Sequence, residues 1–158
     1  MELDGDDIFE ELMTIRDPEK PYLTLAELNV VARERCSVHY DSSFSPRDDP
    51  RTPPKIVGHG GIVAPKRKGR ATVTVELLPT VPHCHLMSII CLAVVVRLRD
   101  ALPVGDSHWR IVIKLCPDSH NDQKMIEKQA NDKERVAAAL ESDAVQKEIR
   151  KLICPMQT

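Results

Sequence analysis

Near the start of the chain, apolar residues recur at the spacing of an amphipathic helix. Those that share one helical face are Ile8, Phe9, Leu12, Met13 and Ile15. Asp17-Pro18 is expected to end this helix, because the residue before a proline avoids helical backbone angles. Thr24 and Glu27 then match a capping box. Because Leu23 and Leu28 stand where its hydrophobic staple belongs, a short second helix is predicted to begin at Thr24.

Three segments alternate apolar and polar residues, as half-buried strands do. Their apolar positions are Cys36, Val38 and Tyr40, then Val73, Val75 and Leu77, and finally Trp109, Ile111, Ile113 and Leu115. The first two strands are expected to pair antiparallel, with residues 41–71 as an overgrown connection.

Helical patterns dominate the second half of the chain. Residues 86–102 are apolar nearly all round, which favours a helix buried in the core, although the three valines at 94–96 fit a strand equally well. A long amphipathic helix and then a final helix are predicted after the third strand. Their faces carry Ile126, Ala130, Lys133, Ala137 and Leu140, and Val145, Ile149, Leu152 and Ile153.

The predicted order of elements is α, α, β, β, α, β, α, α. This order favours the α/β class in its α+β form, with a small mixed sheet of about three strands covered by helices. The length of 158 residues fits one domain.

Charged residues, prolines and glycines are distributed unevenly along the chain. Residues 1–20 carry a net charge of −6, whereas residues 41–72 carry +4 and hold five of the twelve prolines and four of the six glycines. Such a stretch cannot bury enough apolar surface to order itself. We therefore predict an acidic, flexible N-terminus over 1–6 and one domain over 7–154, interrupted by a disordered basic insertion over 41–71. The run KRKGR at 66–70 fits a nuclear-import or RNA-contacting patch or, more simply, a solvated loop.

The overall composition excludes several classes of protein. A net charge of −2 argues against a protein that mainly grips phosphate backbones, and 3% aromatic residues are too few for base-stacking platforms, so no direct nucleic-acid contact is expected. The acidic start does not resemble a signal peptide, and no run approaches the roughly 18 apolar residues that cross a bilayer, so no membrane contact is expected. The five cysteines, without a CxxC spacing, are expected to be reduced thiols of a cytosolic or nuclear protein.

The densest chemical cluster is the segment LPTVPHCH at 78–85. Cys84 is expected in the first turn of the apolar helix, where unpaired N–H groups and the helix dipole lower the pKa of a thiol. Such a thiol suits nucleophilic attack, thiol exchange or capture of a soft metal. A small buried cysteine at a tight turn is an alternative that the residues alone leave open. The flanking His83 and His85 slightly favour a functional role for Cys84 over this structural one.

A four-ligand zinc site is not expected from these residues. On one straight helix Cys84 and Cys91 would share a face but lie about 10 Å apart along the axis, too far to bind one ion. Structural roles are expected for Cys36, Cys91, Cys116 and Cys154.

Four blocks of sequence together resemble the MIP-eighteen-like family, the eukaryotic subunit of the cytosolic iron–sulfur assembly targeting complex. They are DPEKP at 17–21, LTL with ELNVV at 23–31, PTVPHC at 79–84 and DKERVAAALE at 132–141. The domain is also similar to that of bacterial SufT-type iron–sulfur maturation proteins. The likeness covers residues 7–40 and 72–154, and its last two blocks are the most specific.

The resemblance implies a non-enzymatic adaptor found in the cytoplasm and the nucleus. Together with a WD-repeat propeller subunit and a large helical-repeat subunit, such a protein would help deliver [4Fe–4S] clusters to apo iron–sulfur client proteins. Many clients are replication and repair enzymes, which implies a link to chromosome segregation. No cofactor is expected to bind stably, and an iron–sulfur cluster would bind only transiently; a homodimer is left open.

The resemblance also assigns roles to single residues. The reactive cysteine of the family, a cluster or metal ligand, falls on Cys84, and the pocket around it on Thr80, Asp17 and Glu19, beside His83. On the residues alone, Asp17 and Glu19 fit a helix stop.

The sequence departs from the family pattern at three places, of which the first two affect the local partner surface. Tyr22 is an extra residue between the first two blocks, Ala26 stands where an acid is common, and the insertion at 41–71 is unusually long. Two other functions remain alternatives: a thiol-dependent enzyme with Cys84 as nucleophile and His83 or His85 as base, and a pure scaffold in which Cys84 only packs.

Overall fold

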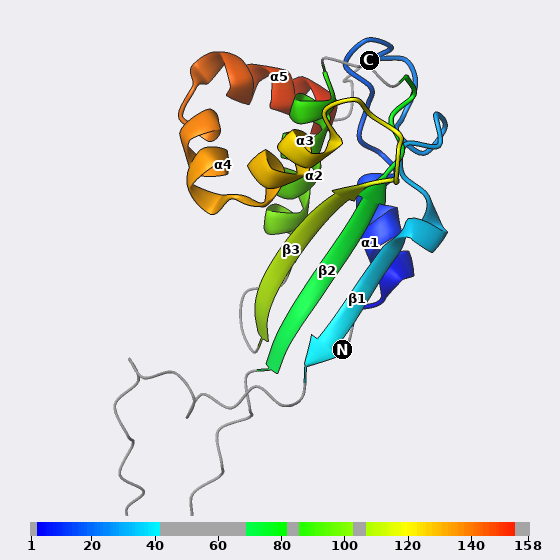
Figure 1. The fold of residues 1–158 in the computed structure, drawn as a ribbon, viewed down its shortest axis with the longest axis vertical. Coiled ribbons are helices and arrows are strands. Elements are labelled where there is room, and N and C mark those ends of the chain that lie inside the picture. The colour runs from blue at the N-terminus through cyan, green and yellow to red at the C-terminus, as the bar shows by residue number, and fades with distance from the viewer. Residues whose placement is uncertain (1–2, 42–68, 82–85, 103–106, 154–158) are drawn as a thin grey trace, which may run out of the picture.

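A computed structural model describes residues 3–41, 69–81, 86–102 and 107–153 (Figure 1). This part of the chain contains a three-stranded sheet and five α-helices. The helices are α1 (Gly5–Leu12), α2 (Met87–Ala101), α3 (Gln123–Asn131), α4 (Lys133–Leu140) and α5 (Asp143–Ile153), and a 3-10 turn, η1, spans Arg33–Arg35. The strands are β1 (Cys36–Asp41), β2 (Gly69–Leu77) and β3 (Ser107–Leu115). The predicted α+β class is confirmed.

The sheet is mixed, with β2 in its centre. β1 pairs antiparallel with β2, so that Val38 lies opposite Val73. β2 pairs parallel with β3, with Val73 opposite Ile111, because the chain crosses over through α2 between the two strands. The predicted antiparallel pair is confirmed. The insertion was predicted over 41–71, but residue 41 at its start belongs to β1 and residues 69–71 at its end belong to β2. Residues 42–68 lie outside the described part.

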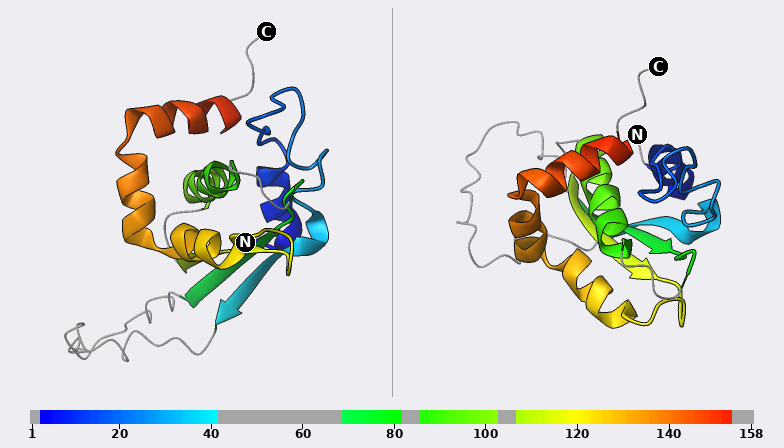
Figure 2. Two further views of the ribbon diagram at one scale, coloured as in Figure 1. Left: turned by 45° about the horizontal axis from the view of Figure 1, so that its top comes forward. Right: turned by 90° about the horizontal axis from the view of Figure 1, so that it is seen from above.

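The core lies between one face of the sheet and the helices α1 and α2 (Figures 1 and 2). Side chains along β2 alternate between this core and the other face, and Val73, Val75 and Leu77 are fully buried. Residues 94–96 are helical rather than a strand, and α2 buries residues on most of its sides, including Val94, Val95 and Leu98. The nearly all-round apolar pattern therefore marked a core helix.

The helix predicted from Thr24 forms only a single turn. Its capping box is present, since Thr24 N donates to Glu27 Oε2 at 2.8 Å and Glu27 N donates to Thr24 Oγ1 at 3.2 Å. The turn ends at Asn29, whose φ of 57° is left-handed. Val30 N donates to the carbonyl of Leu25 at 2.9 Å, the bond that closes a Schellman motif. The prediction of a second helix was wrong because this C-cap follows the N-cap immediately.

The long helix predicted around residues 126–140 is two helices. Asp132 leaves helical geometry, with ψ at 110°, and its side chain accepts hydrogen bonds from the backbone N–H groups of Glu134 and Arg135. It therefore caps the start of α4. The break changes which side of the helix faces the core, so Val136 is buried, whereas Ala137 of the predicted stripe is exposed.

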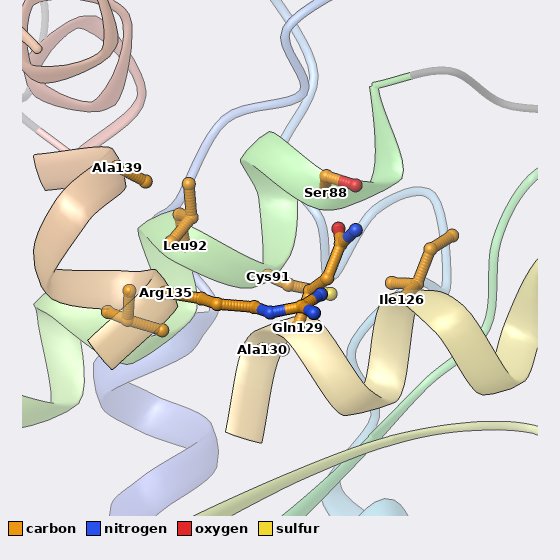
Figure 3. Close-up of a pocket in the computed structure, with 9 residues that line it drawn as sticks. Ser88, Cys91, Leu92, Ile126, Gln129, Ala130, Arg135 and Ala139 are labelled. Atoms are coloured by element: carbon orange, nitrogen blue, oxygen red, sulfur yellow. The ribbon is translucent and has the colours of Figure 1, made fainter. Parts of the chain in front are cut away.

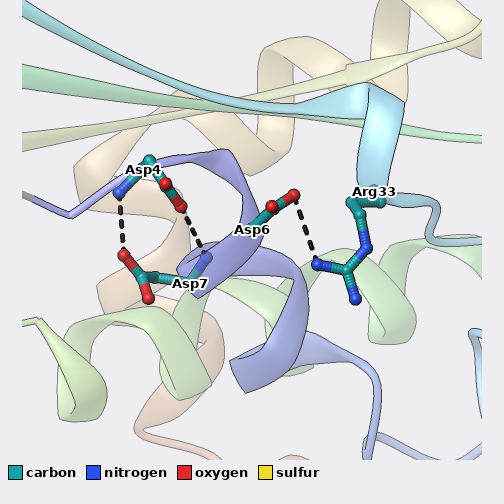
Figure 4. A network of polar contacts seen from close by, with 4 residues as sticks. All are labelled: Asp4, Asp6, Asp7 and Arg33. Atoms are coloured by element: carbon teal, nitrogen blue, oxygen red, sulfur yellow. Dashed lines mark hydrogen bonds and ion pairs between the residues drawn. The ribbon is translucent and has the colours of Figure 1, made fainter.

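The first helix begins within the segment 1–6 that was expected to be flexible. Asp4 N donates to Asp7 Oδ2 and Asp7 N donates to Asp4 Oδ1, which makes a capping box (Figure 4). Asp6 pairs with Arg33 of η1 at 3.2 Å. α1 ends at Leu12, earlier than predicted, and Ile15 is buried from the following loop.

Helix α3 covers the outer edge of β3 with side chains instead of a fourth strand. Asn131 accepts a hydrogen bond from Ile113 N and donates one to Ile113 O, both at 2.8 Å. Glu127 accepts from Leu115 N at 2.7 Å, and Gln123 donates to Leu115 O at 3.3 Å. Because the three side chains stand four residues apart, they share one helix face and bond the backbone groups of β3 that would otherwise be open to another strand.

Replacing Asn131 with alanine is expected to lower the free energy of unfolding by about 1–2 kcal/mol, because its two hydrogen bonds to Ile113 and a third to the carbonyl of Glu127 are lost while helix propensity improves. Urea unfolding measures this loss. Lys128→Ala, on the exposed side of the same helix, is the matched control and should change stability by less than about 0.5 kcal/mol. Equal effects of the two substitutions would contradict a specific role for Asn131 at the strand edge.

Candidate functional site

The centre of the predicted site lies outside the described residues, because these exclude 82–85 and therefore both His83 and Cys84. The helix that follows begins at Met87, and the place predicted for Cys84 in a first helical turn lies outside the described residues. Its N-cap residue, Leu86, supplies no side-chain hydrogen bond. The roles predicted for His83 and Cys84 stay predictions.

The residues that precede this segment lie beside the 17–24 turn at one end of the sheet. Residues 78–81 follow β2, and they lie beside the 17–24 turn where the strand ends (Figures 1 and 2). Leu78 N donates to the carbonyl of Val30 at 3.0 Å, which ties the strand end to the chain that follows the turn. Thr80 is exposed and its side chain makes no hydrogen bond within the described residues. The fold thus places residues 79–81, the described start of the PTVPHC block, at the same end of the sheet as the DPEKP block.

Asp17 is a buried carboxylate whose bonds shape the turn. The residue is 7% exposed, and Oδ1 accepts hydrogen bonds from the backbone N–H groups of Glu19 and Lys20, both at 2.9 Å. Its own N–H donates to the carbonyl of Leu23 at 3.0 Å. Glu19, in contrast, is exposed. Asp17 is not a helix stop, since α1 ends five residues earlier, and it organises the turn that carries Glu19.

The described cysteines are protonated thiols at neutral pH. Burial is the main cause that raises the pKa of Cys36 to about 11 and that of Cys91 to about 12, from an ordinary value of 9.0. Burial also raises the pKa of Cys116, aided by the neighbouring Glu76 carboxylate. A raised pKa leaves little thiolate, so these three positions are poor nucleophiles and poor metal ligands.

These values predict how the thiols react with iodoacetamide. At pH 8 the folded chain should alkylate Cys36 and Cys91 at least tenfold more slowly than the chain unfolded in urea, because the reactive thiolate forms only as pH approaches the raised pKa. Peptide mass spectrometry over time gives the rate at each cysteine. Rapid labelling of Cys91 in the folded chain would contradict its burial, and labelling of Cys84 serves as the internal comparison.

Among the described residues, no group of three or more His, Cys, Asp or Glu side chains could hold a metal ion. No helix in this part of the chain is long and apolar enough to cross a membrane.

A mostly apolar cavity of about 170 Å³ lies between α2, α3 and α4 (Figure 3). Its polar lining consists of Ser88, Gln129 and Arg135, and the Arg135 side chain extends from α4 towards Gln129 and Cys91. Arg135 also pairs with Asp132 at 3.6 Å. The sequence did not reveal this cavity, although Arg135, Val136 and Ala139 from the DKERVAAALE block line it. Only the break at Asp132 turns these residues towards α2.

The described part is thus a small α+β domain in which the long apolar helix α2 lies between the mixed sheet and the three helices α3, α4 and α5, which follow one another around it (Figure 2). No family model matches the chain. It is 34% identical to mouse "Cytosolic iron-sulfur assembly component 2B" over 140 residues, 89% of this chain and 66% of the relative. The protein of the same name from Dictyostelium discoideum is 30% identical over 143 residues, 90% of this chain and 68% of the relative. "MIP18 family protein galla-1" of Drosophila melanogaster is 35% identical over 135 residues, 85% of this chain and 49% of the relative.

The chain belongs to the MIP18 family, which includes proteins named cytosolic iron-sulfur assembly component 2B. It spans about two thirds of the mouse relative's length and about half of the fly relative's. The family resemblance inferred from the four sequence blocks is confirmed.

Proposed function

We propose that this chain is a non-enzymatic adaptor of the cytosolic iron–sulfur assembly targeting complex and helps deliver [4Fe–4S] clusters to apo-proteins of the cytosol and nucleus. The observation that carries the proposal is the similarity to mouse cytosolic iron-sulfur assembly component 2B, which extends over 89% of the chain. The partners proposed are a WD-repeat propeller, a large helical-repeat subunit and the apo-client proteins.

In this proposal the cluster is cargo and Cys84 is its transient ligand. A [4Fe–4S] cluster is usually held by four thiolates, so one cysteine can occupy only one corner and a partner chain or a small thiol must supply the others. The raised pKa values of Cys36, Cys91 and Cys116 support the choice of Cys84 over these three cysteines, because protonated thiols compete poorly for iron.

Affinity capture from cells tests the adaptor role. The tagged chain should recover a propeller protein and a helical-repeat protein together, and their consistent absence would overturn the proposal. A thiol-dependent enzyme would instead turn over a small substrate with no partner present.

Cys84→Ser tests the cysteine in cells depleted of the native chain. Client maturation, followed by iron incorporation and activity of a [4Fe–4S] enzyme, should fall to the level of depleted cells, while partner capture persists. Cys116→Ser is the control, because its thiol is held protonated, and it should restore maturation. Normal maturation with Cys84→Ser would favour the scaffold alternative.

A further inference from the structure

The face of the sheet that points away from the helices carries exposed cations. Because Ala71, Val73 and Val75 point into the core, their neighbours Arg70, Thr72 and Thr74 lie on the opposite side. On β3, Ile113 and Leu115 are buried, so Arg110, Val112 and Lys114 lie on that same side. We call this side of the sheet the outer face.

No described helix covers the outer face. Helices α1 and α2 lie against the other side of the sheet, and α3 runs along the edge of β3 (Figure 2). Arg70, Arg110 and Lys114 are all exposed.

The outer face has an excess of positive charge. Three cations, Arg70, Arg110 and Lys114, stand on this face against two acidic positions, since Asp41 lies opposite Arg70 and Glu76 opposite Lys114 in the register. Arg110 lies opposite Thr72 and has no acidic residue across from it. Arg110 and Lys114 make no hydrogen bond or ion pair with any described residue. His39 of β1 also lies on the outer face, opposite Thr72, and is exposed.

The chemistry of this face selects a polypeptide over a nucleic acid. Single-stranded nucleic acids bind by stacking bases on aromatic rings as well as by phosphate contacts. The outer face presents no aromatic side chain within the described residues, because Tyr40 and Trp109 pack together on the core side with ring centroids 6.1 Å apart. It presents instead the hydroxyl groups of Thr72 and Thr74 between its cations.

We propose that the outer face docks an extended acidic segment of a partner protein. Arg110 and Lys114 lie four residues apart on one strand, about 13 Å, so they match carboxylates four residues apart on an extended peptide. The complementary charge steers the segment to the face and fixes its register. This surface does not depend on the proposed role in cluster delivery, since it rests on the sheet alone.

Fluorescence anisotropy of a labelled 12-residue peptide of alternating Glu and Ser tests the proposal with the full chain. The double variant Arg110→Glu/Lys114→Glu should bind at least about tenfold more weakly than the unchanged chain, and added salt should weaken binding of the latter. Lys124→Glu/Lys128→Glu is the matched control, because it reverses two exposed charges on α3, and it should bind within about twofold of the unchanged chain.

Three results would overturn the proposal: no binding at low salt, equal loss in the control variant, or tighter binding of a 12-residue oligouridine than of the peptide. Methyl NMR of the unchanged chain provides a second measurement that does not depend on the folding of a variant. The peptide should shift the methyl signals of Thr72, Thr74 and Val112 and leave those of buried Val73 in place. Shifts confined to other surfaces would also overturn it.

Discussion

Gly5→Ala is expected to lower the free energy of unfolding by about 1–3 kcal/mol, the range seen when an extra methyl is forced into a packed site. An ideal Cβ at Gly5 would lie 2.2 Å from the carbonyl oxygen of Cys36 and 3.1 Å from its carbon. Both are backbone atoms of the junction between η1 and β1, so relief requires α1 or the strand to move. Urea unfolding, or a melting temperature lowered by roughly 4–8 °C for a loss of about 2 kcal/mol, measures the effect.

The sign of this result is informative because helix propensity predicts the opposite. Alanine normally stabilises a helix relative to glycine by about 0.5–1 kcal/mol. Glu10→Ala, at an exposed position of the same helix, is the control and should change stability by less than about 0.5 kcal/mol. A Gly5→Ala variant as stable as the unchanged chain would show that α1 does not pack on β1 as described.

The contact at Gly5 also shows why the ordered start of α1 could not be predicted from the sequence. Acidic residues at a chain end are typical of a mobile terminus, and neither the capping box between Asp4 and Asp7 nor the approach of Gly5 to the strand leaves a hydrophobic signal. Yet Leu3 N donates to the Tyr40 hydroxyl at 2.7 Å, and that hydroxyl donates back to Leu3 O at 2.9 Å. The terminus is therefore tied to β1 by contacts that only the folded chain creates.

Strong periodic patterns predicted their elements, and polar residues decided where those elements end. The strands around Val38, Val73 and Ile111 followed from simple alternation, because one face of each is buried. Two of the errors, at Asn29 and Asp132, arose where one polar side chain or one left-handed residue ends a turn or restarts a helix. Apolar periodicity does not register such caps.

For a related reason, the sequence singled out Cys84 as a candidate functional residue but did not reveal the side chains of α3 that cover the edge of β3. Cys84 stands out in the sequence because its neighbours are chemically unusual and belong to a family block. The edge-covering side chains of α3, in contrast, look like any solvated face, since Gln123, Glu127 and Asn131 are polar residues on a charged helix. Their function depends on β3 lying beside them, which is a tertiary contact without a local signature.

Asp17→Ala is expected to lower the free energy of unfolding by about 2–3 kcal/mol, because hydrogen bonds to a buried charged acceptor are stronger than neutral ones. The substitution leaves the N–H groups of Glu19 and Lys20 without the oxygen that both now share. The turn is also tied to α5, since Arg16 N donates to the carbonyl of Leu152 at 3.0 Å. We therefore expect faster hydrogen exchange at the amides of Glu19 and Lys20, together with a lower midpoint of urea unfolding.

Asp17→Asn separates the structural role of this residue from the functional role that the family resemblance implies. Its amide oxygen can accept the same two hydrogen bonds, so the variant should keep most of its stability while it loses the negative charge. If Asp17 acts in the proposed site, Asp17→Asn should fold normally and yet impair client maturation. If maturation follows stability alone, so that Asp17→Ala fails and Asp17→Asn does not, Asp17 serves the site only by shaping the turn that carries Glu19.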